Sequence, residues 1–363
     1  MLLNCKITPE TIPSEGILYV DHEKNFRSGH LGHALVEYKK GCIMSFYPNC
    51  SGTRDDQYPG HNGFGWVEYK RSADGGITWD DTKILPYSYD ALINQPFTVS
   101  CEKAVSTKEN EVVLFGTRNL NVNGWEPNLE PVVLRSEDGG ETWSDAVQLC
   151  DKKGRIYDAL VHEGVIYVVM IEGAWKINTE EDGYYLYKSE DSGKTFSLVS
   201  QVPSAIANAY GDLEVMDDGA LICYLYNEND EYHLDYHISY DMGVTWAKSG
   251  KSYVEKRIRN PQVGKVKGGY ILHGRSGCVG RGSLDPTNPA HFVLYTSRDG
   301  LNWDEGMYLC TYDPESGKRA YYSNNVVLTN SDGSQHVLIQ VSIPYDTGTI
   351  GRVNVAHWFL DIE

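Results

Sequence analysis

Carboxylates and arginines in this sequence stand where apolar segments begin or end, which is where a rigid β-scaffold carries its functional loops. The carboxylates are candidates for glycoside hydrolysis, which commonly needs one acid and one base or nucleophile. The arginines are candidates for forked hydrogen bonds to a carboxylate or to a pair of sugar hydroxyls. The candidate acids are Asp55, Asp56, Asp158, Glu172 and Asp212, and the candidate cations are Arg118, Arg259 and Arg275.

A second chemistry fits the histidines and tyrosines, because imidazole and phenol can remove and return a proton in a lyase acting on a uronate. The residues that could serve it are His30, His33, His61 and Tyr322. Gln95, Asp158 and Tyr210 also begin predicted strands and are candidates for binding a polar ligand. His30 and His33 would point to opposite faces of one strand, so neither a metal site nor any other cofactor is predicted.

The amino-acid composition of the chain argues against nucleic acid and membrane as partners. The chain has 363 residues with 32 Lys and Arg against 50 Asp and Glu, a formal charge of −18, and such an acidic surface repels nucleic acid. No apolar run approaches the roughly 20 residues of a membrane span. The first residues, MLLNCK, lack a basic segment followed by an apolar stretch, which predicts a cytoplasmic protein without a secretory signal.

An internal repeat identifies the elements that must position these residues. Five short segments share a Ser-x-Asp-x-Gly-type pattern that usually ends in an aromatic residue, and each follows an alternating, strand-like stretch. Aspartate folds back on backbone amides and glycine accepts positive φ, so each copy predicts a hairpin turn plugged by an aromatic ring. The copies are SADGGITW at 72–79, SEDGGETW at 136–143, SEDSGKTF at 189–196, SYDMGVTW at 239–246 and SRDGLNW at 297–303.

The spacing of the repeat, 50 to 64 residues, matches a four-stranded propeller blade. A sixth unit without the repeat follows at 325–359, and the strand at 16–20 is expected to complete it and close the ring. The predicted fold is therefore all-β, a six-bladed β-propeller of four-stranded antiparallel blades, with residues 1–363 forming a single domain. The starts of the innermost strands and the ends of the second strands then meet at one mouth of a central channel, where the candidate residues gather.

The repeat is the Asp-box, and the chain resembles the sialidase-like β-propeller superfamily. This resemblance implies a pocket with arginines that clamp a carboxylate, a tyrosine nucleophile activated by a glutamate, and an aspartate acid on a first-blade loop. The segment RAYYS at 319–323 matches the tyrosine's context and nominates Tyr322. The loop before the first repeat nominates Asp55 or Asp56 as the acid, with His61 nearby.

The sequence also departs from the family pattern. Leu31-Gly32-His33 replaces the family's Arg-Ile-Pro motif, and Ala209-Tyr210-Gly211-Asp212 stands where the activating glutamate is expected. The sequence thus favours a carbohydrate-active enzyme, an exo-acting glycoside hydrolase with a modified pocket and a glycan or glycoside as substrate. Two alternatives stay open, a non-catalytic propeller that binds glycan or protein and a polysaccharide lyase.

Overall fold

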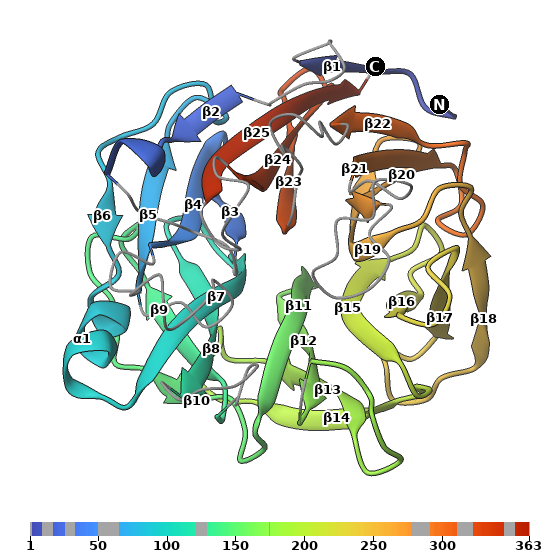
Figure 1. Cartoon of the computed structure of the whole chain (residues 1–363), viewed down its shortest axis with the longest axis horizontal. Coiled ribbons are helices and arrows are strands. Elements are labelled where there is room, and N and C mark those ends of the chain that lie inside the picture. The colour runs from blue at the N-terminus through green and yellow to red at the C-terminus, as the bar shows by residue number, and fades with distance from the viewer. Residues whose placement is uncertain are drawn as a thin grey trace.

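Five four-stranded β-sheets and one five-stranded β-sheet surround a central axis in the computed structural model (Figure 1). The structure describes residues 2–8, 17–25, 33–49, 65–120, 129–173, 175–276, 291–310, 322–344 and 353–362. The innermost strands contact one another in a closed order, from the first blade to the sixth and back to the first. These innermost strands are β3 (Ala34–Lys39), β7 (Phe97–Val105), β11 (Gly154–His162), β15 (Asn208–Val215), β19 (Arg259–Val266) and β23 (Ser323–Thr329).

Within each blade the strands run antiparallel outward from the channel. The second strands are β4 (Cys42–Asn49), β8 (Val112–Leu120), β12 (Val165–Glu172), β16 (Leu221–Asn227), β20 (Gly269–Ser276) and β24 (Gln335–Pro344). The third strands are β5 (Trp66–Ser72), β9 (Val132–Ser136), β13 (Gly183–Ser189), β17 (His233–Ser239) and β21 (His291–Ser297). The outermost strands are β6 (Lys83–Ile84), β10 (Val147–Gln148), β14 (Ser197–Val202), β18 (Lys248–Tyr253) and β22 (Met307–Cys310).

Strands from both ends of the chain form the sixth blade. Its third strand is β25 (Val353–Ile362), and β1 (Cys5–Thr8) and β2 (Ile17–Val20) both pair antiparallel with β25. The prediction that an N-terminal strand closes the ring is confirmed, with β1 joining β2 in that role. Closure removes the free sheet edges that an open ring would leave.

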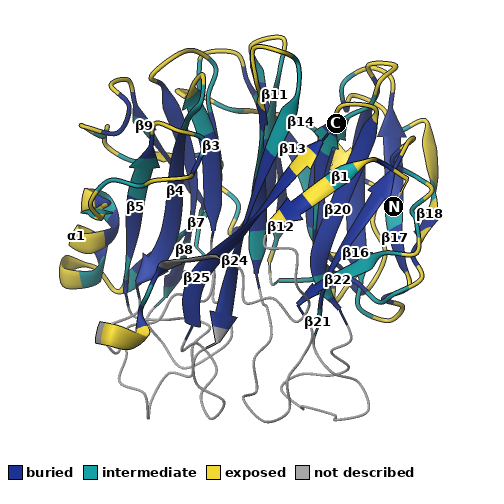
Figure 2. Cartoon of the chain, turned by 90° about the horizontal axis from the view of Figure 1, so that it is seen from above, coloured by how far each residue is buried: buried dark blue, intermediate teal, exposed yellow. Residues whose placement is uncertain are grey.

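The hydrophobic core lies between neighbouring blades. Side chains alternate between the two faces of a strand, and blades cover both faces of each second strand, so these strands are apolar almost throughout. In β16, for example, the side chains from Leu221 to Tyr226 are all buried. Figure 2 shows the same distribution, with buried strands inside and exposed residues in the outer connections.

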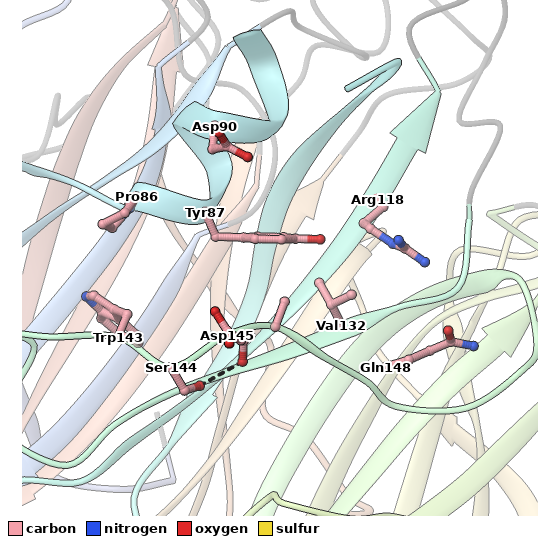
Figure 3. A pocket seen from close by; sticks show the side chains of 10 residues that line it. Pro86, Tyr87, Asp90, Arg118, Val132, Trp143, Ser144, Asp145 and Gln148 are labelled. Carbon is pink, nitrogen blue, oxygen red and sulfur yellow. Dashed lines mark hydrogen bonds between the residues drawn. The ribbon is translucent and has the colours of Figure 1, made fainter. Parts of the chain in front are cut away.

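A short helix interrupts the all-β pattern where the sequence predicted the start of the second inner strand. The helix α1 (Pro86–Asn94) begins with proline at its first turn, where the missing N–H costs nothing, and packs against β5 and β7 (Figure 3). Gln95 follows the helix as an exposed residue, and β7 begins two residues later. One further short helix, the 3₁₀-helix η1 (Glu23–Asn25), follows β2.

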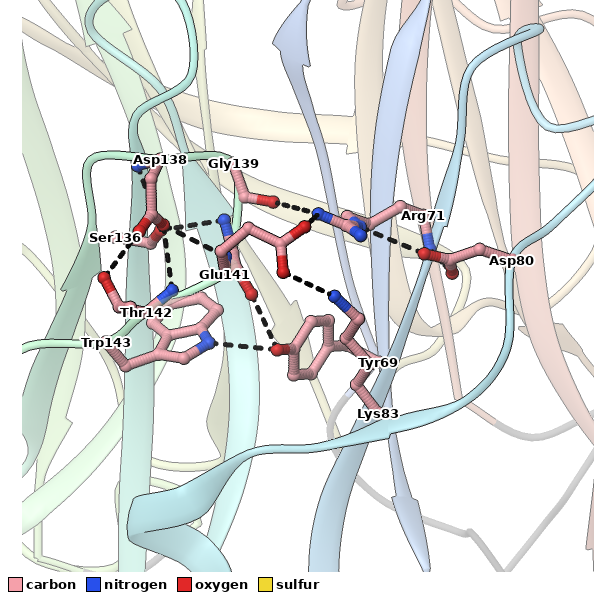
Figure 4. Close-up of polar contacts among 11 residues, drawn as sticks. Tyr69, Arg71, Asp80, Lys83, Ser136, Asp138, Gly139, Glu141, Thr142 and Trp143 are labelled. Carbon is pink, nitrogen blue, oxygen red and sulfur yellow. Dashed lines mark hydrogen bonds and ion pairs between the residues drawn. The ribbon is translucent and has the colours of Figure 1, made fainter.

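The five repeats form the same turn. In the second copy the Ser136 hydroxyl accepts the Gly140 N–H and donates to Asp138, while Thr142 donates to Asp138 through both its N–H and its hydroxyl (Figure 4). The Trp143 indole then donates to the Tyr69 hydroxyl of the preceding blade at 3.3 Å. The turns join third strands to fourth strands, so they stand at the opposite end of the ring from the starts of the inner strands and join each blade to its neighbour.

Candidate functional site

Four of the six inner strands carry a β-bulge whose extra residue reaches the mouth of the channel. In β7, β11 and β15 one residue has no partner in the second strand, and in β19 two residues oppose a single glycine. A bulge aims an extra side chain away from the regular ladder. The bulged residues Glu102, Tyr157, Tyr210 and Asn260 all line one pocket.

That pocket is small, about 30 Å³, and its lining combines tyrosine rings with polar side chains. It lies at the N-terminal ends of the inner strands, which is the end of the channel that the sequence analysis expected. Its residues come from all six blades: His33, Glu102, Arg155, Tyr157, Tyr210, Gly211, Asn260, Gln262, Tyr322, Ser323 and Asn324.

Two tyrosines meet in this pocket. The Tyr322 and Tyr210 hydroxyl oxygens are 3.1 Å apart, and their ring centroids are 6.1 Å apart. Tyr322 precedes β23 and is 8% exposed, while Tyr210 sits at the β15 bulge with φ of 44°. Positive φ is rare for a bulky residue, so the backbone of β15 is specifically held to direct the Tyr210 ring inward. Sequence analysis named both tyrosines, and the structure brings them together.

A buried cation lies beside this pair. The Arg155 guanidinium carbon is 5.3 Å from the ring centroid of Tyr157 and 5.7 Å from that of Tyr210. Its Nη2 forms an ion pair with Glu102 Oε2 at 3.2 Å, and the Arg155 side chain is only 3% exposed. The guanidinium therefore places positive charge against the Tyr210 ring in a dry environment, where charge interactions are strong.

His33 supplies a hydrogen-bond donor to the pocket. The Gln340 amide donates to His33 Nδ1 at 3.0 Å and to the Phe46 carbonyl at 3.2 Å, so Nδ1 is the acceptor and the proton lies on Nε2. Burial lowers the pKa of His33 to about 3, and the ring is neutral at ordinary pH. Its Nε2 is buried without a hydrogen-bond partner among the described residues, so the N–H is available to a ligand.

Asn260 is the second open polar group. Its side chain is 5% exposed, and neither its amide nitrogen nor its amide oxygen has a hydrogen-bond partner in the described part of the chain. A buried amide without partners costs roughly 1–3 kcal/mol, a cost that a bound polar ligand would recover. The residue also has φ of 51° at its bulge. Its geometry and its open polar atoms both favour a binding role.

An arginine cluster adjoins the pocket on the side of the fifth blade. Arg259 and Arg275 face each other in the β19–β20 register. Glu231 accepts a hydrogen bond from the Tyr226 hydroxyl at 2.8 Å. It also forms ion pairs with Arg259 Nε at 3.3 Å and with Arg257 Nε at 3.7 Å. The Tyr226 ring in turn lies 6.0 Å from the Tyr210 ring. The cluster of three arginines and one glutamate therefore carries a net charge of about +2 within reach of the tyrosine pair.

Asp158 and Asp212, which sequence analysis proposed for the site, lie on β11 and β15 next to the pocket and hold the blades together. Asp158 accepts the Leu213 N–H of the fourth blade, and Asp212 accepts the Val263 N–H of the fifth. Asp158 also forms an ion pair with Lys103 at 2.6 Å. Burial, and then the nearby charge of Asp158, raise the pKa of Asp212 well above its ordinary value, which favours the protonated form of this carboxyl.

The remaining predicted residues are distributed elsewhere. Glu172 ends β12 and pairs with Lys152 at 2.8 Å, and Gln95 follows α1 on the surface. Arg118 ends β8, where it pairs with Glu130 at 3.2 Å and lines a separate pocket beside α1. The structure brings none of these three into the central pocket. Four other predicted residues lie outside the described part of the chain: His30, Asp55, Asp56 and His61.

Sequence reasoning missed Arg155 and Glu102 as site residues, whereas Asn260 was among the inner-strand starts expected to face the pocket. Arg155 stands three residues before Asp158, which was a candidate at the start of an inner strand. A charged residue at the start of an apolar strand was the signal that could have identified them. Only the bulges, however, decide which of two neighbouring side chains faces the channel.

Across the described ranges, no group of three or more His, Cys, Asp or Glu residues could hold a metal ion. No helix in these same ranges is long and apolar enough to cross a bilayer.

The strands form a six-bladed propeller with a candidate site at its mouth, and comparison with known proteins shows which proteins the chain is similar to. No family model matches the sequence. The chain is 27% identical over 271 residues to a sialidase of Paraclostridium sordellii, covering 68% of this chain but only 60% of that protein. The resemblance predicted from the sequence is confirmed.

Solved structures share the fold at low sequence identity. A protein of unknown function from Dyadobacter fermentans superposes with a TM-score of 0.68 at 14% identity, over 96% of this chain and 98% of that one. The Trypanosoma rangeli sialidase superposes with a TM-score of 0.62 at 14% identity, over 98% of this chain and 59% of that one. These likenesses establish the architecture, and the activity is a separate question.

Proposed function

We propose that this chain is an exo-acting glycoside hydrolase of the sialidase superfamily that removes an acidic sugar, with Tyr322 as nucleophile and a modified activating group. The observation that carries the proposal is the 3.1 Å contact between the Tyr322 and Tyr210 hydroxyls in the channel-mouth pocket. The sequence relationship to a sialidase supports the same reaction class.

An acidic sugar fits the charges around the pocket. A phenol is a suitable nucleophile for such a substrate, because a neutral group avoids repulsion by the substrate carboxylate. Arg259 and Arg275 provide forked donors for that carboxylate, and Glu231 holds the Arg259 side chain in place. His33 Nε2–H and the Asn260 amide would then bind sugar hydroxyl or amide groups.

We expect activation of Tyr322 to differ from the family's tyrosine–glutamate pair, because Ala209-Tyr210-Gly211-Asp212 stands where the glutamate is expected. An ordinary phenol has a pKa near 10 and is therefore protonated at neutral pH. A protonated phenol is a much weaker nucleophile than a phenolate. The Arg155 guanidinium carbon lies 5.7 Å from the centroid of the Tyr210 ring, which places positive charge beside the oxygen that becomes negative during attack. Because the Tyr322 hydroxyl must lose its proton in that step, we expect activity to rise with pH.

The reaction follows from these positions. The Tyr322 oxygen forms a bond to the anomeric carbon while the glycosidic C–O bond breaks, and the departing oxygen takes a proton from an acid. Asp55 or Asp56 remains the proposed acid. Water then cleaves the tyrosyl–sugar bond, the phenolate leaves, and the acid residue recovers its proton by acting as base toward that water.

A glycan-binding propeller without catalysis is the second candidate, and one observation favours it. The described carboxylates proposed for hydrolysis are engaged elsewhere: Asp158 and Asp212 in contacts between blades, and Glu172 with Lys152. Such a protein would bind the acidic sugar through the arginine cluster and release it unchanged.

Fluorogenic aryl sialosides and aryl uronides distinguish these possibilities. The hydrolase predicts turnover by the wild type and a loss of at least about 100-fold in kcat for Tyr322→Phe, in line with the loss of a catalytic group. Tyr240→Phe is the control, because Tyr240 is 65% exposed in a turn at the opposite end of the ring. Binding without turnover would support the second candidate, and an unsaturated uronate product would establish a lyase instead.

A further inference from the structure

We infer that the chain has a second saccharide site, for a neutral pyranose, on the outer side of the ring between the first and second blades. The site is a pocket of about 570 Å³ between α1 and the segment 143–148 (Figure 3). Its volume falls in the range of roughly 300–1,000 Å³ that is typical of small-ligand pockets. It is separate from the central pocket, with which it shares no lining residue.

An aromatic ring forms one wall of this outer pocket. Tyr87 projects from α1 between the helix and the 143–148 segment, with its hydroxyl directed toward Arg118 (Figure 3). A pyranose presents a face of C–H bonds that packs on an aromatic ring, while its hydroxyls remain at the edge for hydrogen bonding. Tyr87 is half-buried, so the ring is fixed by the protein and still reaches the pocket.

Polar groups stand around the edge of that ring. Arg118 is held by Glu130, with its Nε donating to the Glu130 carbonyl at 2.8 Å and its Nη2 to the carboxylate at 3.2 Å. Asp90 lies on α1 above the Tyr87 ring and Asp145 lies below it (Figure 3). Planar carboxylate and guanidinium groups suit adjacent sugar hydroxyls, which can be bound two at a time.

The charges select a neutral sugar over an acidic one. Asp90 and Asp145 bring two negative charges to the pocket, and Glu130 already neutralises Arg118. A sugar carboxylate would be repelled here, whereas it is attracted by the arginine cluster beside the central pocket. The two pockets therefore differ in ligand class, and the outer one is not a copy of the proposed catalytic site.

Several residues of the outer pocket wall are held by regular elements or by hydrogen bonds. Arg118 lies near the end of β8, Val132 begins β9, and the indole of Trp143 in the connection after β9 donates to the Tyr69 hydroxyl. Ser88 fixes α1 to the first blade, because its hydroxyl accepts the Val67 N–H at 2.9 Å. A site built on such fixed elements loses little conformational entropy when it binds a ligand.

Saturation-transfer NMR with methyl β-D-galactopyranoside and methyl β-D-glucopyranoside tests the inference on the full chain. The Tyr322→Phe background prevents turnover and separates this test from that of the proposed function. At least one probe is expected to bind, and Tyr87→Ala is expected to weaken its affinity about tenfold or more. Tyr89→Ala is the matched control, because Tyr89 lies on the same helix, is 44% exposed and does not line the pocket.

Two additional variants keep the result interpretable. Tyr87→Phe retains the ring and is expected to retain most of the binding, which distinguishes a lost contact from a misfolded helix. N-acetylneuraminic acid is expected to give no Tyr87-dependent signal until Asp90→Asn and Asp145→Asn are combined. The inference is overturned if neither methyl glycoside binds, if binding survives Tyr87→Ala, or if the acidic sugar binds the unaltered outer pocket equally well.

Discussion

Tyr210 and Tyr322 are 112 positions apart in the chain, yet their hydroxyl oxygens lie 3.1 Å from each other across the channel mouth. The contact joins the fourth and sixth blades at the pocket that His33 and Asn260 also line. It exists because a bulge with positive φ turns the Tyr210 ring out of the β15 ladder. The proposed catalytic pair is thus a product of backbone geometry.

Replacing Tyr210 tests how Tyr322 is activated. Tyr210→Phe removes the partner hydroxyl and is expected to lower kcat by about 100-fold, a usual effect for a proton-transfer group. Tyr210→Glu introduces a carboxylate of much lower pKa, so the pH at which kcat reaches half its maximum is expected to fall by several units. The measurement is kcat against pH for both variants. An unchanged pH profile in Tyr210→Glu would refute the pairing.

Arg155 is expected to support the attack of Tyr322 by placing positive charge beside the tyrosine pair. Arg155→Met removes this charge, so kcat is expected to fall, and Arg155→Lys is expected to restore part of kcat. The change also leaves Glu102 buried without its partner, which costs about 3–5 kcal/mol of unfolding free energy. Urea unfolding measures this cost, and adding Glu102→Gln should recover part of it. Equal kcat values for Met and Lys would exclude the electrostatic role.

Replacement of Asp212 or of Asp158 by asparagine is expected to change the unfolding free energy in different directions. The folded pKa of Asp212 is raised above its unfolded value, so this carboxyl destabilises the fold as pH rises above about 4. Asp212→Asn is therefore expected to be neutral or stabilising at pH 7, and without effect below the unfolded pKa. Asp158→Asn removes the partner of Lys103 and is expected to be destabilising.

A double variant checks this account of the channel wall. When Asp158 is replaced, Asp212 can ionise and compensate the Lys103 charge in part. Combining both changes removes that compensation, so the loss of unfolding free energy is expected to exceed the sum of the single changes. Additive losses would show that the two carboxyls do not share the lysine.

Gly274 is expected to be essential for the bulge that carries Asn260. A Cβ atom at Gly274 would stand 2.6 Å from the Arg259 carbonyl oxygen and 3.0 Å from that of Asn260, and both are backbone atoms. Gly274→Ala must therefore displace the bulge, with an expected loss of about 1–3 kcal/mol and of ligand affinity. Gly116→Ala, at a similar place in β8, meets side chains at 3.2 Å and should cost less. Thermal unfolding and binding of an acidic sugar measure the two effects.

Acid should weaken the repeated turns. Hydrogen bonds from Thr142 lower the pKa of Asp138 to about 2 from an ordinary value of 3.8. Because the folded pKa is the lower one, the turn's contribution is complete above about pH 4 and is lost as pH falls toward 2. Thr142→Val should reduce this loss, whereas Thr142→Ser keeps the hydroxyl and should resemble the wild type. Unfolding free energy measured between pH 5 and pH 2 tests both expectations.

The repeats allowed the architecture to be predicted. Each turn is specified locally, since its serine, aspartate and glycine bond within eight residues, and five copies at blade spacing indicate a propeller. Closure by an N-terminal strand followed from counting strands in the last blade. The helix α1 was not foreseen, because the segment YSYDALIN also reads as an irregular connection and it is packing on β5 and β7 that stabilises so short a helix.

The candidate site was only partly predictable. Tyr322 and Tyr210 were found because they open strands, but so does Asp212, whose carboxyl is used between blades. Side-chain direction alternates along a strand, so a single bulge reverses which of two neighbours faces the channel. Sequence alone does not specify where the bulges fall, and Arg155 was missed for that reason.

The sequence by itself determined the ring of blades, the closure of the last blade and the residue types available at its mouth, because turns and alternating strands are local patterns. The tertiary structure decided which of those residues meet. Tyr210 comes to Tyr322 and Arg155 across three blades, while Arg118 is directed outward to a different pocket. These outcomes depend on backbone bulges and on contacts between distant strands, which no local pattern encodes.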